Sequence, residues 1–253
     1  MTELISIVSG KGGTGKTFTA ANLSLALQGF GDQVVCLDTD FDSPNLALQL
    51  GHIPEGHTIE DYLRGDINEH KAINVHDSGL MFVPSALHLS EETITEENIR
   101  DIADRFSSFA DRIIIDSPPG FNEGFYSSLK ASDRVLVVTN PEFQAINDVR
   151  KIAEEAEKHG AKIEGVVLNK MEGMLEEASK GEIEKTTGLD VIQTIPHHKE
   201  ARKSIHKRSP VALDPHSKIG HSFRELAADL SDRKFRAPWY SGLVRGFKKI
   251  TGR

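Results

Sequence analysis

Short runs of Ile, Val and Leu alternate with segments of helical spacing along most of this 253-residue chain. The candidate strands are Leu4–Val8, Gln33–Leu37, Gly79–Val83, Arg112–Ile115, Arg134–Val138, Ile163–Leu168 and Val191–Ile195. The candidate helices are Lys16–Gln28, Glu96–Phe109, Phe143–His159, Leu175–Thr187 and Ile219–Leu230. Several strands are apolar on both faces, as in parallel sheets covered on both sides. The alternation therefore predicts an α/β fold with a mostly parallel, twisted sheet and helices on both faces.

Composition excludes several classes of protein. Hydrophobic residues make up 38% of the chain and charged residues 27%, without a low-complexity block, so the chain is expected to fold. No run of about 18 apolar residues is present, which disfavours a membrane-spanning helix, and the N-terminal residues do not indicate secretion. The single cysteine, Cys36, excludes an internal disulfide and a zinc site built on thiolates. We therefore expect a cytoplasmic protein.

The net charge of −8 is unevenly distributed. From Lys199 to Arg253 there are 14 Lys and Arg against 5 Asp and Glu, whereas the preceding 198 residues hold 16 against 33. An acidic body disfavours broad nucleic-acid binding. The basic end is the candidate contact for an anionic surface.

A glycine-rich segment follows the first candidate strand. Its residues are Gly10, Lys11, Gly12, Gly13, Thr14, Gly15, Lys16 and Thr17. They match the phosphate-loop pattern G-x-x-x-x-G-K-[ST] at every fixed position and in the strand–loop–helix context that the motif requires, which disfavours a glycine turn without a ligand. Such loops bind phosphates through backbone N–H groups and the N-terminus of the following helix. We expect Lys16 to reach the β- and γ-phosphates and the Thr17 hydroxyl to bind Mg²⁺.

Aspartates follow two of the candidate strands. Asp38 and Asp40 stand two residues apart at the end of one strand, so their side chains share a side. Asp116 ends the apolar run that starts at Arg112, a pattern typical of a carboxylate beside Mg²⁺. Carboxylates at the carboxyl ends of parallel strands point into the ligand crevice. We therefore expect these three near the phosphate loop, and Asp42 or Ser43 as the cap of the next helix.

The loop KGGTGKT has a lysine at its start as well as at its end, and it resembles the deviant Walker A signature of the ParA/MinD group of P-loop ATPases. The segments LDTDFDSPNLALQLG, RIIIDSPPGFNEGF, VVLNK and WYSGLVRGFKKITGR extend the resemblance over nearly the whole chain, and it is strongest to archaeal MinD-like ATPases. It implies an ATP-dependent homodimer in which Lys11 reaches the nucleotide of the partner subunit. The iron–sulfur relatives are disfavoured, because they need paired cysteines.

The resemblance also implies a role for each site residue. Lys11, Lys16 and Asp40 would be catalytic, with Asp40 positioning the attacking water. Thr17, Asp38 and Asp116 would lie beside Mg²⁺. The ATP-binding residues would be Gly10, Lys11, Gly12, Gly13, Thr14, Gly15, Lys16, Thr17, Phe18, Gly120, Asn169 and Pro196.

Four of these ATP-binding residues have more specific expected contacts. Phe18 would act through its backbone N–H, and Gly120 would donate an N–H to the γ-phosphate. Asn169 ends a candidate strand and can offer its amide to the N6/N7 edge of adenine, near Pro196. A plain turn role for Asn169 stays open.

The last residues, Trp239–Arg253, place aromatic and aliphatic side chains at helical spacing among basic ones. This pattern predicts a short amphipathic helix that lies in a membrane interface. Two copies in a dimer would bind an anionic membrane by avidity. We therefore divide the chain into an ATPase domain, residues 1–235, and a membrane-targeting segment, residues 236–253. A terminal helix that packs on the domain itself is the alternative.

The expected function is that of a Mg²⁺-dependent ATPase switch that uses ATP and Mg²⁺ and dimerises on ATP. It would be cytoplasmic, peripheral on the inner face of the cell membrane, and would act in spatial regulation such as the positioning of a division site or other machinery. An unidentified activating or cargo protein is expected as a partner, and DNA is not. Two alternatives are a ParA-like DNA-partitioning ATPase and an ATP-dependent assembly scaffold that hardly hydrolyses ATP.

Overall fold

The computed structural model describes residues 2–53, 57–86 and 94–235. Their strands form an eight-stranded sheet in the order β3-β4-β2-β5-β1-β6-β7-β8. The strands are β1 (Glu3–Val8), β2 (Val34–Asp38), β3 (Asn74–Val75), β4 (Met81–Val83), β5 (Arg112–Asp116), β6 (Arg134–Thr139), β7 (Ile163–Met171) and β8 (Val191–Pro196). Every neighbouring pair is parallel except β3 and β4. The predicted fold class is confirmed.

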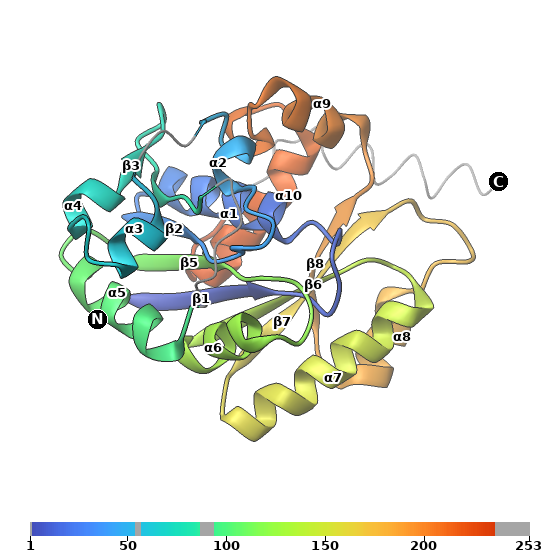
Figure 1. Ribbon diagram of the computed structural model, residues 1–253. Helices are drawn as coiled ribbons and strands as arrows, with labels where there is room; N and C mark the ends of the chain where they lie inside the picture. The colour runs from blue at the N-terminus through green and yellow to red at the C-terminus, as the bar shows by residue number, and fades with distance from the viewer. Residues whose placement is uncertain (1, 54–56, 87–93, 236–253) are drawn as a thin grey trace.

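Helices cover both faces of the sheet (Figure 1). They are α1 (Lys16–Gly29), α2 (Leu46–Gln49), α3 (Ile59–Leu63), α4 (Glu69–Ala72), α5 (Glu96–Phe106), α6 (Glu123–Ala131), α7 (Phe143–His159), α8 (Lys180–Thr187), α9 (Lys199–Lys207), a 3-10 turn (Val211–Leu213) and α10 (Lys218–Leu230). None of the described helices is long and apolar enough to span a membrane.

The hydrophobic core lies on both sides of the sheet because successive strand residues point to opposite faces. On β1, Ile5 and Ile7 pack with α1 and α10, whereas Val8 packs with α6 and α7 and Leu4 with α5. All strand residues of β2 are buried. The central strands are therefore covered on both faces, as their continuous apolar runs predict.

The observed elements differ from the expected ones mainly in the helices. The segment expected to begin a helix at Leu175 becomes helical only at Lys180, because Ser179 caps α8 in a capping box with Glu182. Helix α5 ends at Phe106, three residues early. Helices α3, α4, α6 and α9 and strand β3 were not predicted. In α9 only Ser204 is buried, and Ala201 and Ile205 are the two apolar residues of its sequence, which is too short a stripe to predict a helix.

Candidate nucleotide site

The phosphate loop connects β1 to α1 at the carboxyl end of the sheet (Figure 1). Gly15 precedes α1 in the left-handed region, with φ of 98°, and gives the helix no side-chain cap. The first N–H groups of an α-helix have no partner inside the helix. Here they are left to a ligand, and together with the helix dipole they favour an anion.

Another close approach fixes the start of the loop. A Cβ at Gly10 would lie 2.5 Å from Cβ of Asp148, so α7 packs directly against this residue. Any larger side chain at position 10 would push the loop and α7 apart. This glycine is therefore required by packing between the loop and α7, in addition to any approach of a phosphate.

A lysine and three aspartates meet beneath the loop. Lys16 is 6% exposed and Asp40 7%, and Asp38 and Asp116 are each 1% exposed. Asp38 and Asp116 are register partners on the adjacent strands β2 and β5. The predicted convergence of these side chains is confirmed. Burial lowers the pKa of Lys16, and the three carboxylates act against that shift.

Asp38 organises the loop after β2. Its Oδ2 accepts hydrogen bonds from the N–H groups of Asn45 (3.1 Å) and Leu46 (3.0 Å), and its Oδ1 accepts one from Asp40 (3.2 Å). The expectation that Asp42 or Ser43 caps the next helix is wrong. Asn45 is the N-cap of α2 without a side-chain bond, because Asp38 takes the N–H groups from the strand end.

Asp40 is held in the same loop. Its Oδ1 accepts a hydrogen bond from the N–H of Ser43 at 3.1 Å, and the side chain lines the pocket described below. Burial raises the pKa of Asp40, and the nearby Lys16 ammonium opposes the rise. A carboxylate that is fixed by one oxygen keeps the other for a water molecule.

Asp116 differs from the other two carboxylates. Both of its oxygens are buried and, among the described residues, have no hydrogen-bond partner. Burial raises its pKa to about 7, opposed by Lys16 and the neighbouring Thr17 hydroxyl. Unpaired buried carboxylate oxygens beside a hydroxyl suit Mg²⁺, which proteins hold through one or two carboxylates together with substrate phosphates. The residues present thus fit the metal predicted at Thr17, Asp38 and Asp116, with Asp116 having the freest oxygens.

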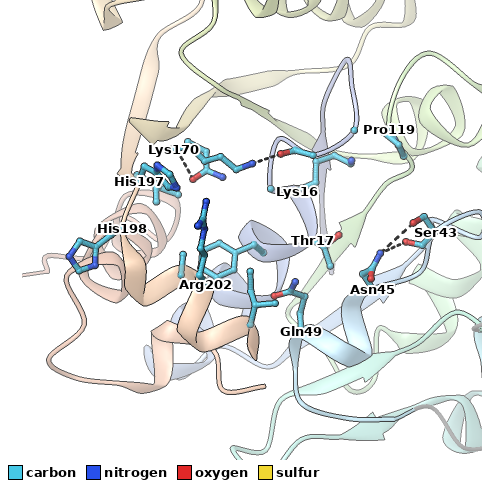
Figure 2. A pocket seen from close by; sticks show the side chains of 18 of the residues that line it. Lys16, Thr17, Ser43, Asn45, Gln49, Pro119, Lys170, His197, His198 and Arg202 are labelled. Carbon is cyan, nitrogen blue, oxygen red and sulfur yellow. Dashed lines mark hydrogen bonds between the residues drawn. The ribbon is translucent and has the colours of Figure 1, made fainter. Parts of the chain in front are cut away.

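A pocket of about 580 Å³ opens beside the loop (Figure 2). The predicted site residues that line it are Gly12, Gly13, Gly15, Lys16, Thr17, Phe18, Asp40, Asn169 and Pro196. The predicted residues outside its lining are Gly10, Lys11, Thr14, Asp38, Asp116 and Gly120. The pocket therefore joins the loop to the predicted adenine segment.

Other lining residues were missed in the sequence. Gln49 comes from α2, Lys170 from the end of β7, and Ala201, Arg202 and Ile205 from α9. Figure 2 shows Lys170, Arg202 and Gln49 among the side chains that line the pocket. The only available signal for α9 was the four-residue spacing of Ala201 and Ile205, which puts both on one side of a helix.

Two predicted contacts are engaged elsewhere. The ammonium of Lys11 pairs with the carboxylate of Glu142, the residue before α7. The N–H of Gly120, expected at the γ-phosphate, donates to the Ser9 carbonyl at 3.0 Å. Both predicted roles therefore require these bonds to open.

Comparison with known proteins decides the family. A family model named ParA, described as NUBPL iron-transfer P-loop NTPase, matches residues 1–231. The chain is 32% identical over 238 residues to the septum site-determining protein MinD of Thermotoga maritima. The matched residues cover 90% of this chain and 87% of that protein. The chain belongs to the ParA/MinD family of P-loop NTPases.

Two further relatives agree with this assignment to the ParA/MinD family. An uncharacterized ATP-binding protein of Methanocaldococcus jannaschii is 31% identical over 239 residues, which cover 94% of this chain and 90% of that protein. The structure of MinD complexed with Mg-ADP from Pyrococcus horikoshii superposes with a TM-score of 0.83 at 30% identity, covering 91% of this chain and 96% of that one. The expected resemblance to MinD-like ATPases is confirmed.

The ParA family model is described as an iron-transfer NTPase. The single cysteine of this chain does not support that activity. Cys36 is buried within β2. Burial raises the pKa of its thiol, which keeps it protonated. Because the thiolate is the form that binds metals, we do not carry iron transfer over to this chain.

Replacing Asp116 with Asn is expected to stabilise this ParA/MinD-family NTPase in the absence of metal. A carboxyl whose folded pKa is raised from 3.8 to about 7 destabilises the folded state when it ionises. This loss of folding stability appears as the pH rises from about 4 to about 7 and stays constant above pH 7. Asp116→Asn should therefore be more stable than the wild type at pH 8 and equally stable at pH 4. Each kcal/mol of added stability raises Tm by about 2–4 °C.

Thermal unfolding in EDTA at both pH values measures this effect. Asp42→Asn is the matched control, because Asp42 is exposed in the loop after β2. A gain in Tm that is equal at pH 4 and pH 8 would contradict the prediction.

Proposed function

We propose that this chain is a Mg²⁺-dependent ATPase switch that dimerises on ATP, binds membrane reversibly and takes part in the spatial positioning of cellular machinery. The observation that carries the proposal is the buried Lys16 among three aspartates beneath a phosphate loop. Membership of the ParA/MinD family and similarity to MinD support it.

Phosphoryl transfer depends on charge neutralisation and in-line positioning more than on covalent chemistry. Lys16 and the N–H groups at the start of α1 would neutralise the phosphates. Asp116 and Thr17 would hold Mg²⁺, which supplies further neutralisation when bound. Asp40, fixed through Ser43, would orient the attacking water and accept its proton.

The nucleotide would lie along the pocket from the loop toward α9. Its phosphates would meet Lys16 and Thr17, and its base would lie near Pro196, which also lines the pocket. The adenine contact of Asn169 stays a prediction. Lys11, half-buried and paired with Glu142, would exchange this partner for the nucleotide of a second copy.

The proposed membrane segment, Trp239–Arg253, lies outside the described residues. The described chain leading to it is tied to the C-terminal end of α1, where Arg233 pairs with Asp32 at 2.9 Å and Phe235 contacts the ring of Phe30. The phosphate loop lies at the other end of this 14-residue helix, roughly 20 Å away. Phe235, the last described residue before the segment, therefore lies far from the phosphate loop, and we propose that ATP acts on the segment through dimerisation.

Co-sedimentation with anionic liposomes tests the proposal. The full chain and a variant that stops at Pro238 are compared with ATP and with ADP. We expect the full chain to bind liposomes with ATP, at least tenfold more than with ADP, and the truncated chain to remain in solution while it still hydrolyses ATP. Liposome binding that survives truncation, or that ignores the nucleotide, contradicts the membrane part of the proposal.

A DNA-partitioning ATPase is the second candidate, and one observation favours it. Helix α9 exposes Lys199, Arg202, Lys203 and Lys207 beside the pocket. Cations on one short helix suit a phosphate backbone. Co-sedimentation with DNA in the same four conditions discriminates, because ATP-dependent DNA binding that survives truncation would favour this function instead.

A further inference from the structure

We propose that Asn169 and Lys170 are positioning residues that hold the phosphate loop ready for a phosphate chain, independently of the nucleotide base. This inference rests on the proposed nucleotide binding. Asn169 Nδ2 donates to the Thr14 carbonyl at 2.7 Å, and Lys170 Nζ donates to the Gly13 carbonyl at 2.6 Å. Figure 2 shows the side chain of Lys170 extended to the loop. Two successive side chains thus hold two successive loop carbonyls.

These bonds act on the N–H groups that a phosphate would use. A trans peptide is planar, and its carbonyl and N–H point in opposite directions. The bond to the Thr14 carbonyl therefore sets the direction of the Gly15 N–H, and the bond to the Gly13 carbonyl sets that of the Thr14 N–H. Glycine-rich loops bind anions through N–H groups turned inward, and here the outward carbonyls are the groups that are held.

The loop is shaped to receive Asn169. A Cβ at Gly15 would lie 2.2 Å from Asn169 Nδ2, so only glycine admits this contact. Asn169 is 3% exposed. Its amide oxygen accepts the N–H of Lys170 at 2.9 Å. The donor and the acceptor end of the amide thus each have a partner, and both partners belong to the loop or to the turn that holds it.

A backbone distortion lets both side chains reach the loop. In a regular strand, neighbouring side chains point to opposite faces. Lys170 instead has φ of 59°, in the left-handed region that non-glycine residues rarely adopt, and the pairing of β7 with β8 shifts between Leu168 and Met171. Strained backbone of this kind is found at functional sites. The distortion here turns Lys170 to the same loop as Asn169.

Affinities for ATP and for inorganic tripolyphosphate, each with Mg²⁺, test the proposal. Tripolyphosphate has no base, so its binding reports on the loop alone. The variants are Asn169→Ala, Lys170→Gly and Lys170→Arg, with Lys162→Ala as a control, because Lys162 is an exposed lysine that precedes β7 at its other end and lies outside the pocket lining. We expect Asn169→Ala and Lys170→Gly each to raise Kd about tenfold for both ligands, and Lys170→Arg and Lys162→Ala to change it less than threefold.

Lys170→Gly separates positioning from stability. Glycine adopts positive φ without strain, so this variant should keep or raise Tm while it binds tripolyphosphate more weakly. Loss of ATP affinity with unchanged tripolyphosphate affinity would overturn the inference and assign Asn169 and Lys170 to the base. Wild-type protein that binds ATP but not tripolyphosphate would overturn it too. Wild-type protein that binds neither ligand would instead contradict the proposed function.

Discussion

Replacing Lys16 with Ala is expected to lower ATP turnover by about 10²–10³-fold and to weaken ATP binding, because one preorganised charge at a developing anion is worth that much. The structure sharpens the reason. Lys16 is buried among Asp38, Asp40 and Asp116, so its removal leaves three buried carboxylates near the phosphate loop without the cation that lies among them. The variant therefore loses an attraction and gains a repulsion. Steady-state turnover and calorimetric ATP binding measure the two effects.

Lys11→Ala is the control for Lys16, because it removes the same charge from the same loop. Lys11 pairs with Glu142 and lies outside the pocket lining. We expect Lys11→Ala to bind ATP as the wild type does and to lose ATP-dependent dimerisation in sedimentation velocity runs. If Lys16→Ala binds ATP within threefold of the wild type, the assignment of Lys16 to the phosphates fails.

Asp40→Ala is expected to lower turnover by about 10²-fold or more while ATP still binds, because positioned proton acceptors contribute about 10²–10⁴-fold. Asp40 lines the pocket, and the bond from the Ser43 N–H holds one of its oxygens. Without the side chain, the carboxylate that would orient the water and accept its proton is lost. Removing a raised-pKa carboxylate near the phosphates also removes a repulsion, so ATP affinity should be equal to or higher than that of the wild type.

Single-turnover kinetics with a separate binding measurement distinguish these effects. Asp42→Ala is the matched control, since it removes an exposed carboxylate two residues along the same loop. We expect it to hydrolyse ATP within threefold of the wild-type rate. Retained hydrolysis in Asp40→Ala would remove Asp40 from the proposed mechanism.

Local patterns predicted the fold class and the centre of the site. The strand–loop–helix at β1 and α1 and the aspartates at the ends of β2 and β5 each lie within one short segment, where residue type and spacing determine conformation. Parallel strands place their carboxyl ends at one edge, so the meeting of Lys16 with Asp38, Asp40 and Asp116 also follows from the sequence.

Contacts between distant segments required the tertiary structure. Asn169 and Thr14 are 155 residues apart, and no local pattern reports that the end of β7 meets the phosphate loop. The capping of α2 by Asp38, the pairing of Lys11 with Glu142, and the wall that α9 adds to the pocket are of the same kind. The alternation of strands and helices determined by itself that this chain forms a phosphate-binding α/β sheet, because periodicity and loop chemistry are local. Which side chains hold the loop in place was decided only by the packing of β7 and α7 against it, because that depends on contacts across the whole fold.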